Sequence, residues 1–324
     1  MAKNKLKVAV IGAGNMGKNH VRVYSELPNC QLVAICDINE DLARQFGEKY
    51  RCNYYQDFRQ MLDSEELDAV SVVVPTKSHK AIAVEILKRK INCLVEKPIA
   101  FNIAEGQAII SAARASGALL SVGHIERFNP AVAKLLDLVE DGVLGSIISI
   151  EAQRVGPYVP KNRDTGVLID LAVHDIDIIN HLLKSGPQKV YSKGGRIVDE
   201  IFEDHAEIFL DYGKTSGYVQ VNWITPLKIR RLRVTGSKGY AELDYITQKL
   251  FVCDTYYKVN VKKIGKEKLD TSGQREIPIK FREPIKEELK SFLDCVLKNK
   301  KPMVSGEEGL LALDITLKAL KRMR

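Results

Sequence analysis

The sequence contains no run of apolar residues that approaches the roughly 20 needed for a membrane-spanning helix, so no membrane partner is expected. Residues 1–12 begin with basic side chains but continue straight into a glycine-containing turn, and we expect no signal peptide. Hydrophobic residues make up 45% and charged residues 28% of the 324 positions. This balance is typical of an ordered, soluble, globular protein.

Cysteine is scarce and shows no pairing pattern. The chain has 6 cysteines and no C-x-x-C pair, which speaks against a paired-cysteine metal or redox motif. Cys36 and Cys93 lie inside apolar segments. The distribution indicates reduced core thiols in a cytoplasmic protein.

Positive charge is in excess but is nowhere concentrated. The net charge of +8 comes from short basic groups, such as residues 88–90 and 298–301. Solvated faces and helix C-termini explain such groups better than nucleic-acid binding does, so no nucleic-acid partner is expected. A mild positive field would also suit an anionic nucleotide substrate.

Apolar runs alternate with helical stretches through the first 123 residues. The predicted strands are 6–11, 31–36, 69–74, 92–95 and 118–122. The predicted helices lie near 15–27, 40–49, 57–63, 78–90 and 103–116. This alternation predicts a Rossmann domain with a doubly wound parallel sheet, whose ligand crevice lies at the C-terminal ends of the strands.

The pattern changes after residue 129, and a chain of this length favours a second domain. Alternating segments between 188 and 263 predict an α+β domain with a mostly antiparallel open sheet, covered by helices on one face. The other predicted elements after this point are a helix from Pro130, a strand over 146–155, a helix over 166–184, a loop over 264–280 and helices over 283–299 and 306–323. We therefore expect domains over 1–123 and 124–324, with helix 306–323 as a segment that packs back on the first.

Three glycines separate the first predicted strand from the first predicted helix. Gly12 permits a tight turn, Gly14 lets the backbone approach a pyrophosphate, and Gly17 lets helix and strand pack. Asp37 ends the next strand; it can accept hydrogen bonds from both ribose hydroxyls, and its charge would repel a 2'-phosphate. NAD is the expected cofactor, the alternative being a tight turn that binds nothing. The expected turn residues of the cofactor site are Gly12, Gly14, Asn15, Met16 and Gly17.

Lys97 follows a predicted strand at the crevice edge of the sheet. A lysine beside a nicotinamide can hydrogen-bond a substrate hydroxyl and hold it for oxidation. The alternative is a surface lysine paired with Glu96. His79 also lies just beyond a strand end, where it either contacts the cofactor or simply begins a helix.

Asp170 and His174 are spaced i,i+4 on a predicted helix and so share one face. A carboxylate there can orient an imidazole and stabilise its protonated form, as a general base for an alcohol requires. His174, Asp177 and His181 also have spacings compatible with a metal, but no further ligand is apparent. We expect no metal at this site.

Four motifs in this order, GAGNMG, VVPTKSH, EKPIA and D-x-x-x-H, resemble the Gfo/Idh/MocA family of NAD(P)-dependent sugar oxidoreductases along essentially the whole chain. The resemblance implies that Lys97, Asp170 and His174 line the substrate site. It implies a cofactor groove lined by Pro75, Thr76, His79, Glu96 and Lys97. It also implies a homo-oligomer, a dimer or tetramer, that uses the open face of the second sheet.

The segment VGHIERFNPAV, residues 122–132, resembles the branch of this family that acts on UDP-linked N-acetylated sugars. Arg127 is then a substrate contact, or alternatively a structural ion pair. Asn129 is a substrate contact, a plain helix cap or both. Tyr158 and Arg163 lie in a loop before the D-x-x-x-H segment that either closes over the ligands or is a solvated connection.

The resemblance implies a dehydrogenase that oxidises the 3-hydroxyl of UDP-N-acetylglucosamine to a 3-keto sugar. Same-family alternatives are a UDP-sugar uronate, a free hexose or an inositol as the substrate. An alternative from another class is a non-catalytic NAD-binding regulator, against which the presence of Lys97, Asp170 and His174 argues.

Overall fold

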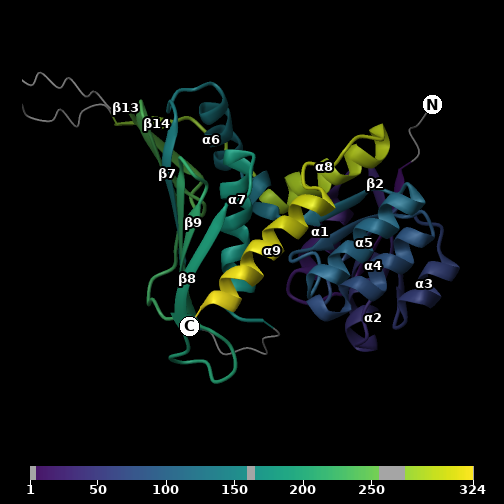
Figure 1. The fold of residues 1–324 in the computed structure, drawn as a ribbon. Helices are drawn as coiled ribbons and strands as arrows, with labels where there is room; N and C mark the ends of the chain where they lie inside the picture. The colour runs from purple at the N-terminus through teal and green to yellow at the C-terminus, as the bar shows by residue number, and fades with distance from the viewer. Residues whose placement is uncertain (1–4, 159–164, 255–273, 324) are drawn as a thin grey trace, which may run out of the picture. The chain divides into compact units, whose positions relative to one another are not determined.

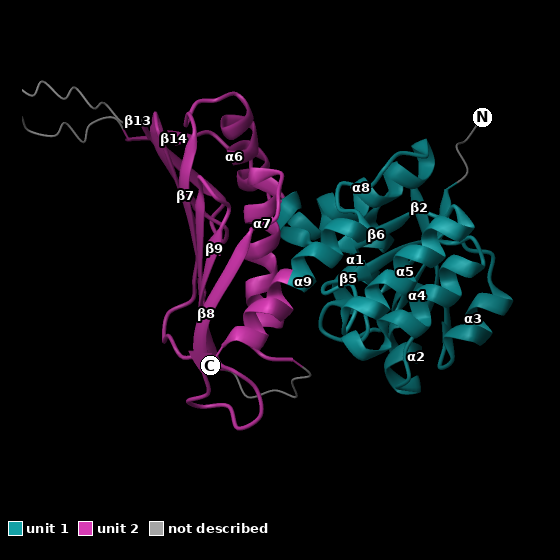
Figure 2. Ribbon diagram, in the orientation of Figure 1, with its two compact units in different colours: residues 1–128, 283–314 teal, residues 129–282, 315–324 magenta. Residues whose placement is uncertain are grey.

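The computed structural model describes residues 5–158, 165–254 and 274–323, which form two compact units (Figures 1 and 2). Unit 1 comprises residues 1–128 and 283–314, and unit 2 comprises residues 129–282 and 315–324. Residues 283–314 thus belong to unit 1, whereas the predicted second domain included them. Periodicity shows that a helix has an apolar face but not which sheet that face covers.

Unit 1 contains a six-stranded parallel sheet of order β3-β2-β1-β4-β5-β6, which confirms the predicted doubly wound fold. The order reverses between β1 and β4, the point at which such sheets bind ligands. The short strand β3 falls outside the predicted strands. The strands are β1 Leu6–Ile11, β2 Cys30–Cys36, β3 Asn53–Tyr55, β4 Ala69–Val72, β5 Asn92–Glu96 and β6 Leu120–Gly123.

The helices of unit 1 agree closely with the sequence periodicity. They are α1 Gly17–Glu26, α2 Glu40–Tyr50, α3 Phe58–Ser64, α4 His79–Lys88, α5 Ile103–Ser116 and α8 Pro284–Lys298, with short 3-10 turns η1 Thr76–Ser78 and η2 Ile125–Phe128. Tyr24 of α1 and Leu289 and Phe292 of α8 are buried in one cluster over β1 and β2. Each such apolar side chain contributes about 1.5–3 kcal/mol by leaving water. This burial explains why α8 belongs to unit 1.

The boundary between the units falls inside α9, Gly306–Arg322. A capping box begins this helix. The Ser305 hydroxyl accepts the Glu308 N–H at 3.2 Å, and the Glu308 carboxylate accepts the Ser305 N–H at 2.9 Å.

Unit 2 contains an eight-stranded sheet of order β14-β13-β12-β11-β7-β10-β9-β8. Among the described strands of this sheet, the β7–β10 pair alone is parallel, so the predicted mostly antiparallel sheet is confirmed. The strands are β7 Ile147–Val155, β8 Lys189–Gly195, β9 His205–Asp211, β10 Ser216–Asn222, β11 Ile229–Gly236, β12 Gly239–Asp244, β13 Lys249–Asp254 and β14 Gln274–Ile277. The loop predicted over 264–280 is wrong at β14, an edge strand whose polar side chains hide it from sequence periodicity.

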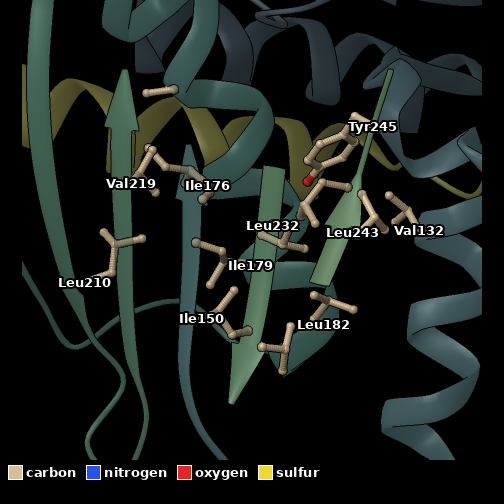
Figure 3. Packing of buried hydrophobic residues seen from close by; sticks show 14 of the residues in the cluster. Val132, Ile150, Ile176, Ile179, Leu182, Leu210, Val219, Leu232, Leu243 and Tyr245 are labelled. Atoms are coloured by element: carbon tan, nitrogen blue, oxygen red, sulfur yellow. The ribbon is translucent and has the colours of Figure 1, made fainter. Parts of the chain in front are cut away.

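Helices cover one face of this sheet: α6 Pro130–Glu140, a π-helical turn η3 Leu168–Ala172, α7 Val173–Leu183 and the last part of α9. Figure 3 shows Ile176, Ile179 and Leu182 of α7 against Ile150 and Leu232 of the sheet. No helix in the described parts of the chain is long and apolar enough to cross a membrane.

Candidate functional site

The glycine turn after β1 is shaped by close backbone contacts. Gly12 has a φ of +96°, and a Cβ there would collide with the Val73 carbonyl. A Cβ on Gly17, the first residue of α1, would collide with the Gly12 carbonyl. Gly14 is different, because no atom lies within 4 Å of the position a Cβ would take. The turn is therefore tight where the backbone packs and open at the glycine expected to face a pyrophosphate.

The Asp37 carboxylate is held against this turn. Its Oδ2 accepts the Ala13 N–H at 2.7 Å, and its Oδ1 accepts the Asn39 N–H at 2.9 Å. Each carboxylate oxygen has a second lone pair, so the group keeps acceptors for the two hydroxyls of a ribose. Asn39 also caps α2 by accepting the Leu42 N–H. Asp37 thus presents a fixed negative charge beside the loop that begins α1.

His79 joins the ends of β4 and β5. Its Nδ1 lies 2.9 Å from the Pro98 carbonyl oxygen and its Nε2 lies 2.9 Å from the Val74 carbonyl oxygen. Burial lowers the pKa of the imidazole, which is only 1% exposed. Both ring nitrogens thus face main-chain carbonyl oxygens, and His79 links the segment that follows β4 to the segment that follows β5.

Lys97 directly follows β5, and its side chain is half-buried. The preceding Glu96 points inward: its Oε2 accepts the Lys97 N–H at 3.0 Å, and its Oε1 lies 3.1 Å from His20 Nε2. Burial acts to raise the pKa of Glu96, but the hydrogen bond and charge of His20 hold it below its ordinary value. The carboxylate is therefore fixed between α1 and the Lys97 main chain.

In unit 2, Asp170 and His174 lie at a break in helical geometry. Asp170 belongs to the π-helical turn η3, and His174 is in the first turn of α7. Both side chains are half-exposed, whereas Ile169, Val173 and Ile176 are buried. A π turn in a helix is an uncommon feature that occurs often at functional sites. The structure therefore presents the D-x-x-x-H pair on the accessible side of this segment.

A buried ion pair that sequence reasoning missed anchors α7. The guanidinium of Arg154 on β7 donates from Nε to Asp175 Oδ2 at 2.8 Å and from a terminal nitrogen to Oδ1 at 2.9 Å. The side chains are 5% and 1% exposed. Because Asp175 directly follows His174 in the chain, this bidentate contact fixes the main chain from which the His174 side chain extends. No local sequence pattern marks a pair 21 residues apart.

Glu203 holds the start of the π turn. Its Oε1 accepts the Leu168 N–H at 3.2 Å, and its main-chain oxygen accepts the Val167 N–H at 3.0 Å. Burial raises the pKa of this carboxyl. A Cβ at position 166 would collide with the Glu203 carboxylate where it lies, so Gly166 leaves room for that carboxylate. Sequence reasoning missed Glu203, whose only signal is the glycine it faces.

Two residues predicted to contact substrate have structural partners. Arg127 is buried and pairs with Glu308 at 2.6 Å, which favours the ion-pair alternative. Asn129 uses its Oδ1 to cap α6 at Ala131 N–H and its Nδ2 to donate to the Tyr245 carbonyl oxygen, both at 3.1 Å. The structure therefore shows the helix cap that the sequence offered as one interpretation of Asn129.

The structure describes one of the two predicted loop residues, Tyr158 and Arg163. The Tyr158 hydroxyl donates to Asp199 at 3.1 Å, within unit 2. Arg163 lies outside the described residues. Lys97 belongs to unit 1, whereas Asp170 and His174 belong to unit 2.

One trio of metal-ligand side chains is close enough to share an ion among the residues that the structure describes. It consists of His20, Glu96 and Glu288, and not of the helical set His174, Asp177 and His181. All three members belong to unit 1.

Both units match known protein families. Residues 6–124 match the description "Oxidoreductase family, NAD-binding Rossmann fold", and residues 132–242 match "GFO/IDH/MocA C-terminal domain". The first match covers the glycine turn and the strand ends of unit 1. The second covers the segment that contains Asp170 and His174.

Named relatives act on sugars and cyclitols. UDP-N-acetylglucosamine 3-dehydrogenase of Acidithiobacillus ferrooxidans is 29% identical over 76% of each chain. The solved structure of that enzyme from the same organism matches with a TM-score of 0.86 and 25% identity, covering 99% of this chain and 98% of its own. Myo-inositol 2-dehydrogenase of Thermotoga maritima is 26% identical over 98% of this chain and 96% of its own.

Proposed function

Because this chain belongs to the Gfo/Idh/MocA oxidoreductase family, we propose that it is an NAD-dependent dehydrogenase that oxidises the 3-hydroxyl of UDP-N-acetylglucosamine to a 3-keto sugar. The observation that carries the proposal is the likeness to UDP-N-acetylglucosamine 3-dehydrogenase over nearly the whole chain. Lys97, Asp170 and His174 stand in the motifs that the family uses for this chemistry.

The unit 1 turn fits a dinucleotide. The open position beside Gly14 supports the approach of a pyrophosphate, and the N-terminus of α1, which begins at Gly17, would favour an anion there. Asp37 supports NAD over NADP, since its fixed carboxylate suits ribose hydroxyls and repels a phosphate. Exposed Ile38 and Asn39 follow it, with no arginine or lysine at these positions.

The proposed reaction removes a proton and a hydride from one CH–OH group. The bound nicotinamide supplies a hydride acceptor. His174 takes the hydroxyl proton, and Asp170 orients the imidazole and stabilises its charged form. Lys97 donates a hydrogen bond to the reacting oxygen and holds it in place. Lys97 itself is the alternative base in the same scheme.

A second candidate is a free polyol as substrate. The similarity to myo-inositol 2-dehydrogenase, over 98% of this chain, favours it. An enzyme for a nucleotide sugar recognises the two phosphates, whereas an inositol dehydrogenase does not need them. If the chain is instead a non-catalytic NAD-binding regulator, it should bind the cofactor without any turnover.

The experiment is to incubate the purified chain and NAD with UDP-N-acetylglucosamine, its uronate, free N-acetylglucosamine and myo-inositol. Reduced cofactor and a product two mass units lighter, formed only from the UDP-linked N-acetylated hexose, are the expected result. Turnover of myo-inositol alone would establish the second candidate. NAD binding without turnover of any of the four would support the regulator.

We also propose that the chain works in the cytoplasm as a dimer or tetramer. All 6 cysteines are free, which suits a reducing compartment.

The oligomer proposal rests on three exposed aromatic side chains of the second sheet. They lie in cross-strand register on β8, β9 and β10 and are Tyr191, Phe209 and Tyr218, which are 52%, 45% and 38% exposed. Such a face suits coverage by another copy of the chain. Light scattering on the wild type and a Phe209→Ser variant tests this, with a loss of mass expected for the variant.

A further inference from the structure

A buried cluster of ionisable side chains lies beneath the strand ends of unit 1. It brings together His20 of α1, Glu96 of β5 and Glu288 of α8, which are 0%, 7% and 1% exposed. Their ligand atoms all lie within 4.8 Å of one another. Neither Glu288 oxygen has a hydrogen-bond partner within the described parts of the chain. The proposed reaction makes no use of Glu288.

The cluster contains two carboxylates, and burial decides their charges. Two ionised carboxylates side by side in a dry site repel each other and both lose hydration, so one keeps its proton. Glu96 has a ring nitrogen of His20 at 3.1 Å and the Lys97 N–H at 3.0 Å as donors. Glu288 has no such donor, and burial together with the charge of Glu96 raises its pKa well above the ordinary value. Glu96 is therefore the ionised member and Glu288 the neutral acid.

The ionised member is also the one adjoining Lys97. Because a carboxylate only accepts hydrogen bonds, the His20 nitrogen facing it carries a proton. A Cβ at Gly123 would lie only 3.1 Å from the Glu96 carboxyl carbon, so β6 closes off another side. The cluster thus restrains Glu96, whose second oxygen holds the Lys97 main chain.

We propose that His20 and Glu288 are positioning residues that keep Glu96 charged and fixed, and thereby hold Lys97 in the geometry of the reaction. This inference rests on the proposed dehydrogenase function. Neither residue touches substrate, and Glu288 acts as a neutral acid facing Glu96. The other ionisable groups around the cluster are Lys97 and His79 on the Glu96 side and Tyr24 on the Glu288 side.

The activity test compares Glu288→Leu with Glu288→Gln. Leucine keeps the bulk but places no polar atom beside Glu96, and we expect kcat with NAD and UDP-N-acetylglucosamine to fall about tenfold at nearly unchanged KM. Glutamine keeps both shape and a hydrogen-bond donor, and should remain within about threefold of the wild type. Equal losses in the two variants, or a change confined to KM, would overturn the positioning role.

The charge assignment has its own test, the melting temperature against pH. A carboxyl whose pKa is raised in the folded state contributes most stability below the unfolded pKa, about 4.3, and loses it as pH rises toward the folded pKa. Glu288→Gln removes this loss. Its melting temperature minus that of the wild type should therefore grow from pH 4 upward. A difference independent of pH would contradict a neutral Glu288.

The two tests separate the possible failures. If the wild type turns over none of the offered substrates, the proposed function fails, but the melting curves still decide the charge of Glu288. Elemental analysis of the purified wild type tests whether a metal ion occupies the trio. One equivalent of zinc or manganese, lost in Glu288→Leu, would make the trio a metal site and overturn the positioning proposal.

Discussion

The two units hold their functional residues in different ways. In unit 1 the glycine turn is shaped by main chain: Gly12 lies against the Val73 carbonyl, and Asp37 accepts N–H groups from Ala13 and Asn39. In unit 2 the segment of Asp170 and His174 is held by side chains from distant strands and loops. The glycine turn is therefore held by contacts of its own main chain. The helical segment proposed to bind substrate is held by tertiary contacts between distant parts of unit 2.

This difference decides what each unit tolerates. A main-chain turn depends on the absence of side chains at a few positions, so its weak points are its glycines. A helix anchored by a buried ion pair depends on both partners, because removal of one leaves an uncompensated charge. Substitutions in the two units should consequently fail in different ways.

The largest expected effect is the loss of turnover on removing a reacting group from either unit. Lys97→Ala and His174→Ala should each lower kcat by about 100-fold or more, since general acid–base groups contribute on that scale. NAD affinity, measured by calorimetry, should stay near that of the wild type in both. Near-normal turnover in both variants would remove these residues from the mechanism.

Next in size is the effect of breaking the anchor of α7. Asp175→Ala leaves the Arg154 guanidinium buried without its carboxylate, and we expect a loss of about 3–5 kcal/mol in the free energy of unfolding. Urea unfolding of the purified protein measures it. The turn in unit 1 should keep its NAD affinity in conditions where the variant is folded.

The matched control replaces both partners with apolar residues of similar size. In Arg154→Met/Asp175→Leu no charge remains buried, so most of the lost stability should return. Turnover should remain low if the ion pair also fixes the start of α7 beside His174. A double variant as unstable as Asp175→Ala would argue that charge burial is not the cause.

Much of unit 1 was predictable from sequence because its signals are local. Gly12, Gly14 and Gly17 stand between a strand and a helix, and Asp37 ends the following strand, as the pattern predicts. The Ser305 capping box is likewise local, since its partner is three residues away. Such features depend on spacing along the chain, which the sequence shows directly.

The rest depends on contacts between distant segments. The partner of Arg154 is 21 residues away, and Glu203 reaches Leu168 across 35 residues. Nothing near these positions marks the pairing. The same limit explains why Asn129 was open to two interpretations: its cap was visible, but its second contact, to the Tyr245 carbonyl, lies 116 residues away.

The smallest expected effect comes from a matched pair within the glycine turn. Gly14→Ala places a methyl group in open space, so the melting temperature should stay unchanged. The Kd for NAD should rise about tenfold, because the methyl group would stand where we propose that the pyrophosphate approaches. Gly17→Ala forces its Cβ onto the Gly12 carbonyl, so it should lower both NAD affinity and the melting temperature. Calorimetry and thermal melts separate the two. If Gly14→Ala bound NAD as the wild type does, the open glycine would not be the pyrophosphate contact, and the view of unit 1 as a main-chain cofactor site would lose its main support.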